Sequence, residues 1–405
     1  MNPLPLVTAE LRRNPLGCAA IVALIALTVA LGVAVTAQER ALRAASARAA
    51  DRFDLVVGAP GSPTQLVLTT VYLQPAALEL LPAGTLAQLA QEPGVAAIAP
   101  VAVTDSYRGY TIVGTTAEFA AAGGITDGRA FAQEHEAIVG SAVQLPLGTM
   151  LRPAHGSPAE NMIETHEHDF VVAVVGRAQA TGTPWDRAIM IPIEAVWAMH
   201  DDVHGHGAEG GPSTPARLDT RSPERGLERV PAIVVKPRSM TDAYQLRAKY
   251  RGHDTVAVFP AEVLVPLYAL LGDVRELIAG MALAFQALLI AAVVLVIVAA
   301  LAARRQSIGV LRALGAPPSF VFLTVWLQGA LLIACGVLAG AVLGWALARG
   351  IGAWASARTG LSIDAAPGAA EAWLLLALFV GGSLFATLPS LATLRVSADR
   401  LLRLA

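Results

Sequence analysis

Four long uncharged runs constrain what this chain can fold into. They cover residues 17–37, 277–303, 320–348 and 372–394. Each is at least as long as the roughly 20 apolar residues that an α-helix needs to cross a bilayer. The sequence is 55% hydrophobic and 15% charged, which is too apolar for an ordinary soluble chain. We therefore expect an α-helical membrane protein with four transmembrane helices and extensive contact with membrane lipid.

Arginines are distributed unevenly around these runs. Segments 1–16, 304–319 and 395–405 are arginine-rich, whereas segment 349–371 offsets its two arginines with two acidic residues. Short arginine-rich segments of bacterial membrane proteins stay on the cytoplasmic side of the membrane. Both termini and segment 304–319 are therefore predicted to be cytoplasmic. Segment 349–371 then becomes a loop on the other side. The net charge of −2 argues against a nucleic-acid partner.

The largest polar region lies between the first two runs. Residues 52–260 are enough for one or two small domains, and we expect an α+β periplasmic domain inserted between the first and second transmembrane helices. Alternating and apolar stretches predict strands at 52–57, 66–73, 95–103, 110–113, 170–175, 188–191, 230–235 and 255–259, with helices at 84–91 and 241–250.

Two segments are predicted to form a helical stalk between membrane and domain. Segment 38–51 is rich in Ala and Arg and has no helix breaker, so the first helix should continue through it. In segment 261–276 the apolar residues follow a heptad spacing that leads into the second run. The facing stripe would be Leu42, Ala45 and Ala49. The alternative is that these helices pack on their own domain.

The cytoplasmic segment 304–319 reads RRQSIGVLRALGAPPS. Ile308, Leu311 and Leu314 give a short helix one apolar stripe, and Gly315 followed by two prolines ends it. A short, half-apolar helix exposed to the cytosol indicates a docking site for a partner.

This string resembles the coupling segment of FtsX/MacB-type (type VII-like) ABC transporter permeases, which have four spans and a MacB-like periplasmic domain. The resemblance also implies a β-rich insert in that domain, which would here lie at about 137–193. Ser307 stands where that family usually has an acidic residue. The matching positions are Arg304, Arg305, Ile308, Leu311, Arg312, Ala313, Leu314, Gly315 and Ala316.

The resemblance implies a permease subunit of the bacterial inner membrane that works by mechanotransmission. A cytoplasmic ABC ATPase would bind ATP and Mg²⁺ and move the coupling helix, and the periplasmic domain would export, extract or relay a substrate. The alternative is a regulator of a periplasmic partner such as a cell-wall hydrolase. This chain is not expected to be an enzyme or to hold a cofactor, because neither Lys236 nor Lys249 lies in a phosphate-binding loop. The permease is expected to be a homodimer or to pair with a similar permease.

Small residues recur at a four-residue spacing in the third run. Gly336, Gly340 and Gly344 would allow a neighbouring helix to approach closely, within the subunit or across a dimer.

Histidines cluster near segment 196–229, which its His, Gly, Pro and Arg content predicts to be a loop. A zinc site is a hypothesis here, because borderline-soft cations favour imidazole nitrogens. Its ligands would come from His166, His168, His200, His204 and His206. Trp185, Asp186 and Arg187 are assigned no role.

Overall fold

The computed structural model describes residues 3–155, 170–201, 229–265, 280, 316–387 and 390–391. The chain divides into two compact units. We call Met1–Arg43, Leu271–Trp354 and Ile363–Ala405 the helical unit, and Ala44–Leu270 with Ala355–Ser362 the sheet unit.

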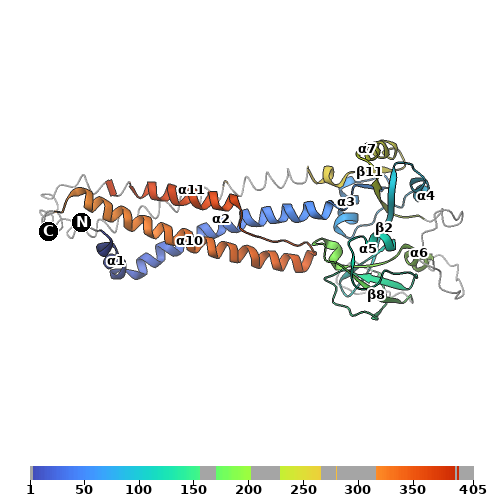
Figure 1. The fold of residues 1–405 in the computed structure, drawn as a ribbon, viewed down its shortest axis with the longest axis horizontal. Helices are drawn as coiled ribbons and strands as arrows, with labels where there is room; N and C mark the ends of the chain where they lie inside the picture. The colour runs from blue at the N-terminus through green and yellow to red at the C-terminus, as the bar shows by residue number, and fades with distance from the viewer. Residues whose placement is uncertain are drawn as a thin grey trace. The chain divides into compact units, whose positions relative to one another are not determined.

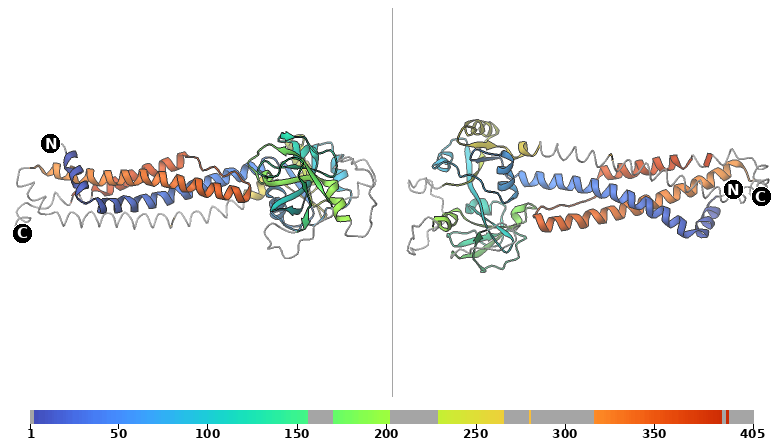
Figure 2. Two further views of the ribbon diagram at one scale, coloured as in Figure 1. Left: turned by 90° about the horizontal axis from the view of Figure 1, so that it is seen from below. Right: turned by 180° about the vertical axis from the view of Figure 1, so that it is seen from behind.

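The helical unit contains α1 (Leu4–Arg13), most of α2 (Pro15–Ala50), most of α10 (Pro318–Thr359) and α11 (Ala369–Phe385). Of the described helices, α2 and α10 are long and apolar enough to cross a membrane, and α11 is a shorter apolar helix. These helices run beside one another in each view (Figures 1 and 2). The Asn14 side chain accepts a hydrogen bond from Gly17 N, 3.2 Å away, at the start of α2.

One continuous helix, α2, covers both the predicted first span and the predicted stalk segment 38–51. Its burial pattern differs from the predicted stripe, because Leu42 is 41% exposed while Ala45 and Ala49 are fully buried. The second predicted stalk segment, 261–276, begins within a helix at residues 260–265. The rest of that segment lies outside the described residues, as does nearly all of the predicted span at 277–303. Pro260 occupies the first helical turn, where proline is tolerated.

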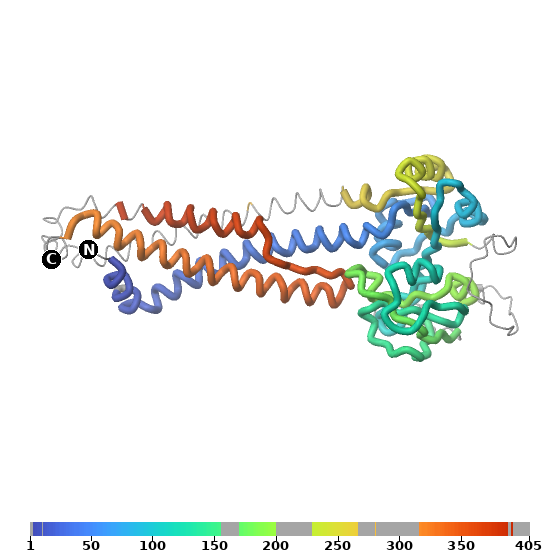
Figure 3. Tube along the Cα trace, viewed as in Figure 1, coloured from blue at the N-terminus to red at the C-terminus, as the bar shows by residue number. Residues whose placement is uncertain are grey.

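The predicted loop at 349–371 is shorter in the structure. Helix α10 continues from 318 to Thr359 because Ala, Trp, Ser and Arg support a helix there and no proline interrupts it. It ends at Gly360, whose φ of +74° is accessible to glycine at little cost. Figure 3 shows the extended segment that follows, at residues 360–368, before α11 begins at Ala369.

The sheet unit is built on one mixed sheet with the strand order β11-β1-β10-β2-β3-β9-β5-β8-β4. The strands in its first part are β1 (Leu55–Gly58), β10 (Ala232–Pro237) and β11 (Val256–Val258). Strand β2 (Val95–Tyr107) pairs with β10 through residues 95–101 and with β3 (Tyr110–Thr115) through 102–107. It therefore belongs to both parts of the sheet.

The second part of the sheet starts earlier than the predicted insert at 137–193. It includes the end of β2, all of β3 and β4 (Ile125–Gly128), because β3 pairs in parallel with β9 (Ala188–Pro192). Its other strands are β5 (Glu136–Val139), β6 (Met150–Leu151), β7 (Ala154–His155) and β8 (Val172–Ala178). Strand β6 pairs with β8, and β7 pairs with β2.

The predicted strand at 66–73 is wrong, because these residues form most of helix α3 (Pro63–Tyr72). The helix starts with Ser62, whose hydroxyl accepts a hydrogen bond from Gln65 N, and with Pro63 in the first turn. Its β-branched residues Val67, Thr69, Thr70 and Val71 are buried, so tertiary packing overrides their strand preference.

Three further helices of the sheet unit pack on the strands (Figure 1). Helix α4 (Thr85–Ala90) contacts β2, and α7 (Met240–Lys249) contacts β10 and β11. The short helices α5 (Ala117–Ala121) and η1 (Pro184–Arg187) precede β4 and β9 respectively. Helix α6 (Ile193–Asp201) contacts β2, β3 and β9, so the predicted loop at 196–229 begins with a helix that buries Val196 and Met199.

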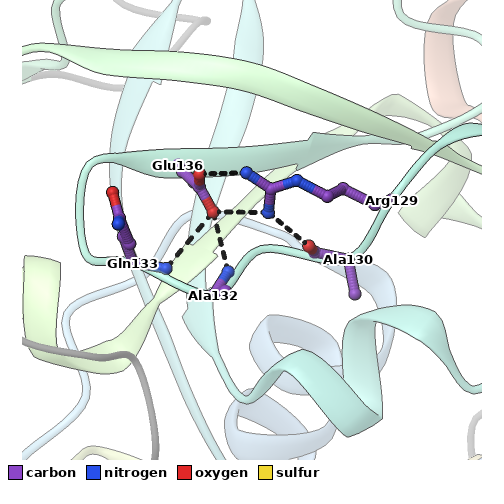
Figure 4. Close-up of polar contacts among 5 residues, drawn as sticks. All are labelled: Arg129, Ala130, Ala132, Gln133 and Glu136. Carbon is purple, nitrogen blue, oxygen red and sulfur yellow. Dashed lines mark hydrogen bonds and ion pairs between the residues drawn. The ribbon is translucent and has the colours of Figure 1, made fainter.

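The chain between β4 and β5 is fixed by one buried carboxylate (Figure 4). Glu136 Oε2 accepts from Ala132 N at 2.7 Å, from Gln133 N at 3.2 Å and from Arg129 Nη1 at 2.9 Å. The Arg129 side chain also pairs with Glu136 Oε1. These bonds lower the pKa of Glu136, chiefly through Arg129, and raise that of Arg129.

Candidate functional site

The predicted coupling residues Arg304, Arg305, Ile308, Leu311, Arg312, Leu314 and Gly315 lie outside the described residues. The description resumes at Ala316, which is buried, and α10 begins with Pro318. The role of this segment therefore stays a prediction.

The predicted zinc ligands His166, His168, His204 and His206 also lie outside the described residues. Only the backbone of His200, within α6, is described. Zinc binding stays a prediction too.

The glycines of the third run face α2 within the same subunit. A Cβ atom added at Gly336 would lie 2.6 Å from Ile25 Cγ2. At Gly340 it would lie 2.6 Å from Ala26 O, and at Gly344 2.7 Å from Ala30 O. Two of these obstacles are backbone atoms, which cannot rotate away. The pair of helices therefore depends on glycine for its close approach.

The same small-residue packing continues beyond the predicted positions. Ala37 and Ala41 of α2 pack with Ala348 of α10 and with Ala365. A Cβ atom at Gly352 would lie 2.7 Å from Ile363 O. Gly352 extends the four-residue spacing of the predicted glycines, so following that spacing past residue 348 would have found it.

A buried ion pair joins α2 to the start of α11. Arg40 Nη2 lies 3.2 Å from Glu371 Oε1, and Nε of the same arginine lies 3.4 Å from it. The Glu371 side chain is fully buried, whereas that of Arg40 is 40% exposed. Arg40 also donates to the carbonyl of Ala366. One arginine thus fixes both the segment before α11 and its first turn.

In the sheet unit, residues 181–187 form a turn followed by η1, and we call these residues the anchor loop. Its centre is Asp186, a buried carboxylate. Oδ1 accepts from the backbone N and the hydroxyl of Thr181, both at 2.8 Å, and Oδ2 accepts from Gly182 N at 2.7 Å. Gly182 has a φ of +70°, which favours glycine. Because the anchor loop leads directly into β9, its position is tied to the middle of the sheet.

The end of α10 is bonded to the anchor loop. Arg187 Nη1 donates to Ala357 O at 2.5 Å, and Ser362 N donates to Gly182 O at 3.0 Å. Arg48 of α2 donates to Ser362 O at 2.6 Å. The end of α10 and the residues after it are therefore bonded to the loop, and α2 is bonded to the residues after α10.

An aromatic cluster attaches the residues after α2 to the same loop. Phe53, Phe119 of α5 and Trp185 have ring centroids 5.3–6.0 Å apart, which is the range of favourable aromatic pairs. The guanidinium of Arg52 lies 5.4 Å from the Phe119 ring. Burial lowers the pKa of Arg52, and the Asp186 carboxylate opposes that shift. Asp186 thus balances a partly buried positive charge.

Sequence reasoning assigned no role to Trp185, Asp186 and Arg187. Their partners, such as Phe53 and Ala357, are remote in sequence, so local patterns carried no signal for the contacts. The local signal was limited to Thr181-Gly182-Thr183-Pro184 before a buried strand, which predicts a turn.

Comparison with known families finds a match at residues 279–398, which fit the FtsX-like permease C-terminal family. No match was found among curated proteins. The matched segment includes the predicted coupling residues, α10 and α11. Together with two helices long and apolar enough to cross a bilayer, it points to a membrane protein and supports an FtsX-type permease, the membrane component of an ABC-type system.

Proposed function

We propose that this chain is a four-span inner-membrane permease subunit that transmits movement from a cytoplasmic ABC ATPase to its sheet unit. ATP binding and hydrolysis in the partner would displace the segment containing Leu311. The sheet unit, on the periplasmic side, would then move and drive export, extraction or relay of a substrate. Both termini would be cytoplasmic, and two copies of the chain would work as a pair.

The observation that carries this proposal is a chain of hydrogen bonds: Arg48 of α2 bonds Ser362, and Ser362 and Ala357 of α10 bond the anchor loop. Helices α2 and α10 each begin in the helical unit and end in the sheet unit. An uninterrupted α-helix transmits displacement along its axis because each turn is hydrogen-bonded to the next. At their ends, Arg48 and Ser362 of the sheet unit are bonded to each other, and Ser362 to the anchor loop.

The contacts within the helical unit suit the same role. Ile25, Val29 and Val33 of α2 pack with Ile333 and Val337 of α10. Trp326 Nε1 of α10 donates to Ser383 O of α11 at 3.1 Å. Because packed interiors resist compression, such contacts make the three helices move together rather than slide independently.

The test is whether ATP changes the anchor loop through the coupling segment. The chain and its cognate ATPase would be assembled in lipid nanodiscs, and hydrogen exchange at residues 181–187 would be measured with and without ATP. We expect an ATP-dependent change in the wild type that is lost in Leu311→Asp while the complex still assembles. Leu80→Asp, the same exchange at a 45%-exposed position of the sheet unit, is the matched control.

An unchanged response in Leu311→Asp would contradict the proposal, because movement would then enter the chain elsewhere. Loss of assembly in Leu311→Asp would be resolved with Leu311→Ala, which removes apolar contact without adding a charge.

A further inference from the structure

A cavity of about 570 Å³ lies within the sheet unit, where three segments converge. One wall consists of residues that end and follow α2, namely Ala50, Asp51, Phe53 and Asp54. A second is the first turns of α7, and a third is the stretch from Phe259 to Glu262. Its volume falls within the range of pockets that take drug-sized molecules.

Aromatic and apolar side chains form much of the lining. Tyr244 and Phe259 pack edge to face, with centroids 5.2 Å apart. Tyr244 is 56% exposed and Met240 is 73% exposed, whereas Phe53 is buried. Large apolar side chains on one rim of a cavity favour a ligand with an apolar body, because binding removes their surface from water.

The charges of the lining have one sign. Asp51, Asp54 and Glu262 contribute carboxylates, and none of the described residues lining the cavity is basic. Arg247, outside the lining, pairs with Glu262 and lies 4.9 Å over the Phe259 ring. Within the described part of the chain, Asp51 and Asp54 have no such ion pair.

We propose that this cavity binds an organic cation with an apolar, aromatic-sized body. Asp51 and Asp54 would supply the negative potential, and the face of Tyr244 would attract the cation, as the Phe259 ring already attracts Arg247. The Asp51 and Asp54 carboxylates repel an anionic ligand. The basic side chain of a docked peptide would fill only a small part of the cavity, so a small molecule fits the volume better.

A ligand in this cavity would regulate the movement of α2 during ATP turnover, an inference that rests on the proposed function. Ala50 ends α2, and Pro260 begins the helix at residues 260–265. Both line the cavity beside α7, which packs on β10 and β11. A bound molecule would therefore connect the end of α2 to the sheet, and would change how readily that end moves during ATP turnover.

The binding test uses two probes of matched shape and opposite charge. These are (biphenyl-4-ylmethyl)trimethylammonium and biphenyl-4-ylmethanesulfonate. Saturation-transfer NMR on the full chain in nanodiscs, with empty nanodiscs subtracted, would measure both. We expect the cation to bind and the anion not to bind. Asp51→Asn with Asp54→Asn should weaken cation binding about tenfold or more, and Tyr244→Ala should weaken it severalfold.

Asp127→Asn is the matched control, since Asp127 is an exposed acid of β4 outside the cavity. Equal binding of both probes, or undiminished cation binding in the Asp51/Asp54 variant, would overturn the site. Binding only of a lysine- or arginine-bearing peptide would also overturn it, in favour of a protein partner.

A second measurement separates the site from its regulatory role. ATP turnover of the assembled complex would be recorded as the ammonium probe is added. A change in turnover that disappears in the Asp51/Asp54 variant would support regulation. Binding without such a change would overturn regulation and leave the site standing. Failure of the Leu311→Asp test would overturn the proposed function without affecting the binding result.

Discussion

Arg40 and Glu371 form an ion pair in which the carboxylate is fully buried and the guanidinium reaches solvent. The two residues come from α2 and from the first turn of α11. A Cβ atom on Gly368 would lie 2.7 Å from Glu371 Oε2 and 2.9 Å from Arg40 Cζ. The backbone at the start of α11 therefore packs directly against the pair.

We expect Arg40→Ala to destabilise the chain by about 2 kcal/mol. Removing one partner of a buried pair leaves an uncompensated charge, which costs about 3–5 kcal/mol when both partners are buried, and the exposure of Arg40 reduces this. Thermal unfolding of the full chain in detergent would measure the loss. Arg43→Ala is the control, because Arg43 pairs with Glu39 one turn away at the surface and should cost about 0.5 kcal/mol or less. Equal losses in the two variants would contradict the prediction.

Gly340→Ala should separate α2 from α10. The added methyl group would meet Ala26 O and the Val29 side chain, each at 2.6 Å, and overpacking of this kind costs about 1–3 kcal/mol. The midpoint of thermal unfolding should therefore fall. Gly350→Ala lies in the same helix and would meet nothing within 4 Å, so it should not lower the midpoint. A fall in both variants would mean that altered helix flexibility, rather than a steric clash, explains the effect.

Asp186→Asn should uncouple the anchor loop from ATP turnover. The change removes the negative charge that balances Arg52, and it replaces one of the two acceptor oxygens by an amide NH₂, which cannot accept the hydrogen bond from the backbone on that side. ATP hydrolysis by the assembled complex should continue, while the ATP-dependent change in hydrogen exchange at residues 181–187 should be lost. Asp127→Asn should retain that change. A normal response in Asp186→Asn would rule out the loop as the point of transmission.

Glu136 should contribute stability that depends on pH. Its pKa in the folded chain is lowered by Arg129, so the contribution is complete above the unfolded pKa of about 4.3 and is lost as pH falls through the folded value. We expect Glu136→Gln to increase hydrogen exchange at Ala132 and Gln133 at pH 7. At pH 3, below the unfolded pKa, the variant and the wild type should differ less than at pH 7. A difference of the same size at both values would show that the charge of Glu136 is not involved.

Sequence patterns predicted the elements whose causes are local. The uncharged run at 17–37 and the breaker-free segment after it correspond to the single helix α2. The strands at 95–103 and 188–191 lie within β2 and β9, because apolar residues cluster there between turn signals. The helix at 84–91 corresponds to α4.

The predictions that differ from the structure depend on contacts between remote residues. Residues 66–73 favour a strand by composition, yet a serine cap and burial make them helical. The anchor loop could not be predicted because Arg187 and Ala357, which it brings together, are far apart in the chain. For the same reason, no sequence pattern near Glu371 indicated that Arg40 is its ion-pair partner.

The strand order also determines when the sheet unit can finish folding during synthesis. Strand β1 lies between β10 and β11, both of which are made only after nearly all of the unit. The β2–β3 hairpin, by contrast, closes through a two-residue turn as soon as it emerges. Strand β1 must therefore wait with both edges unpaired. A nascent chain paused before residue 232 would be at its most vulnerable to aggregation and proteolysis.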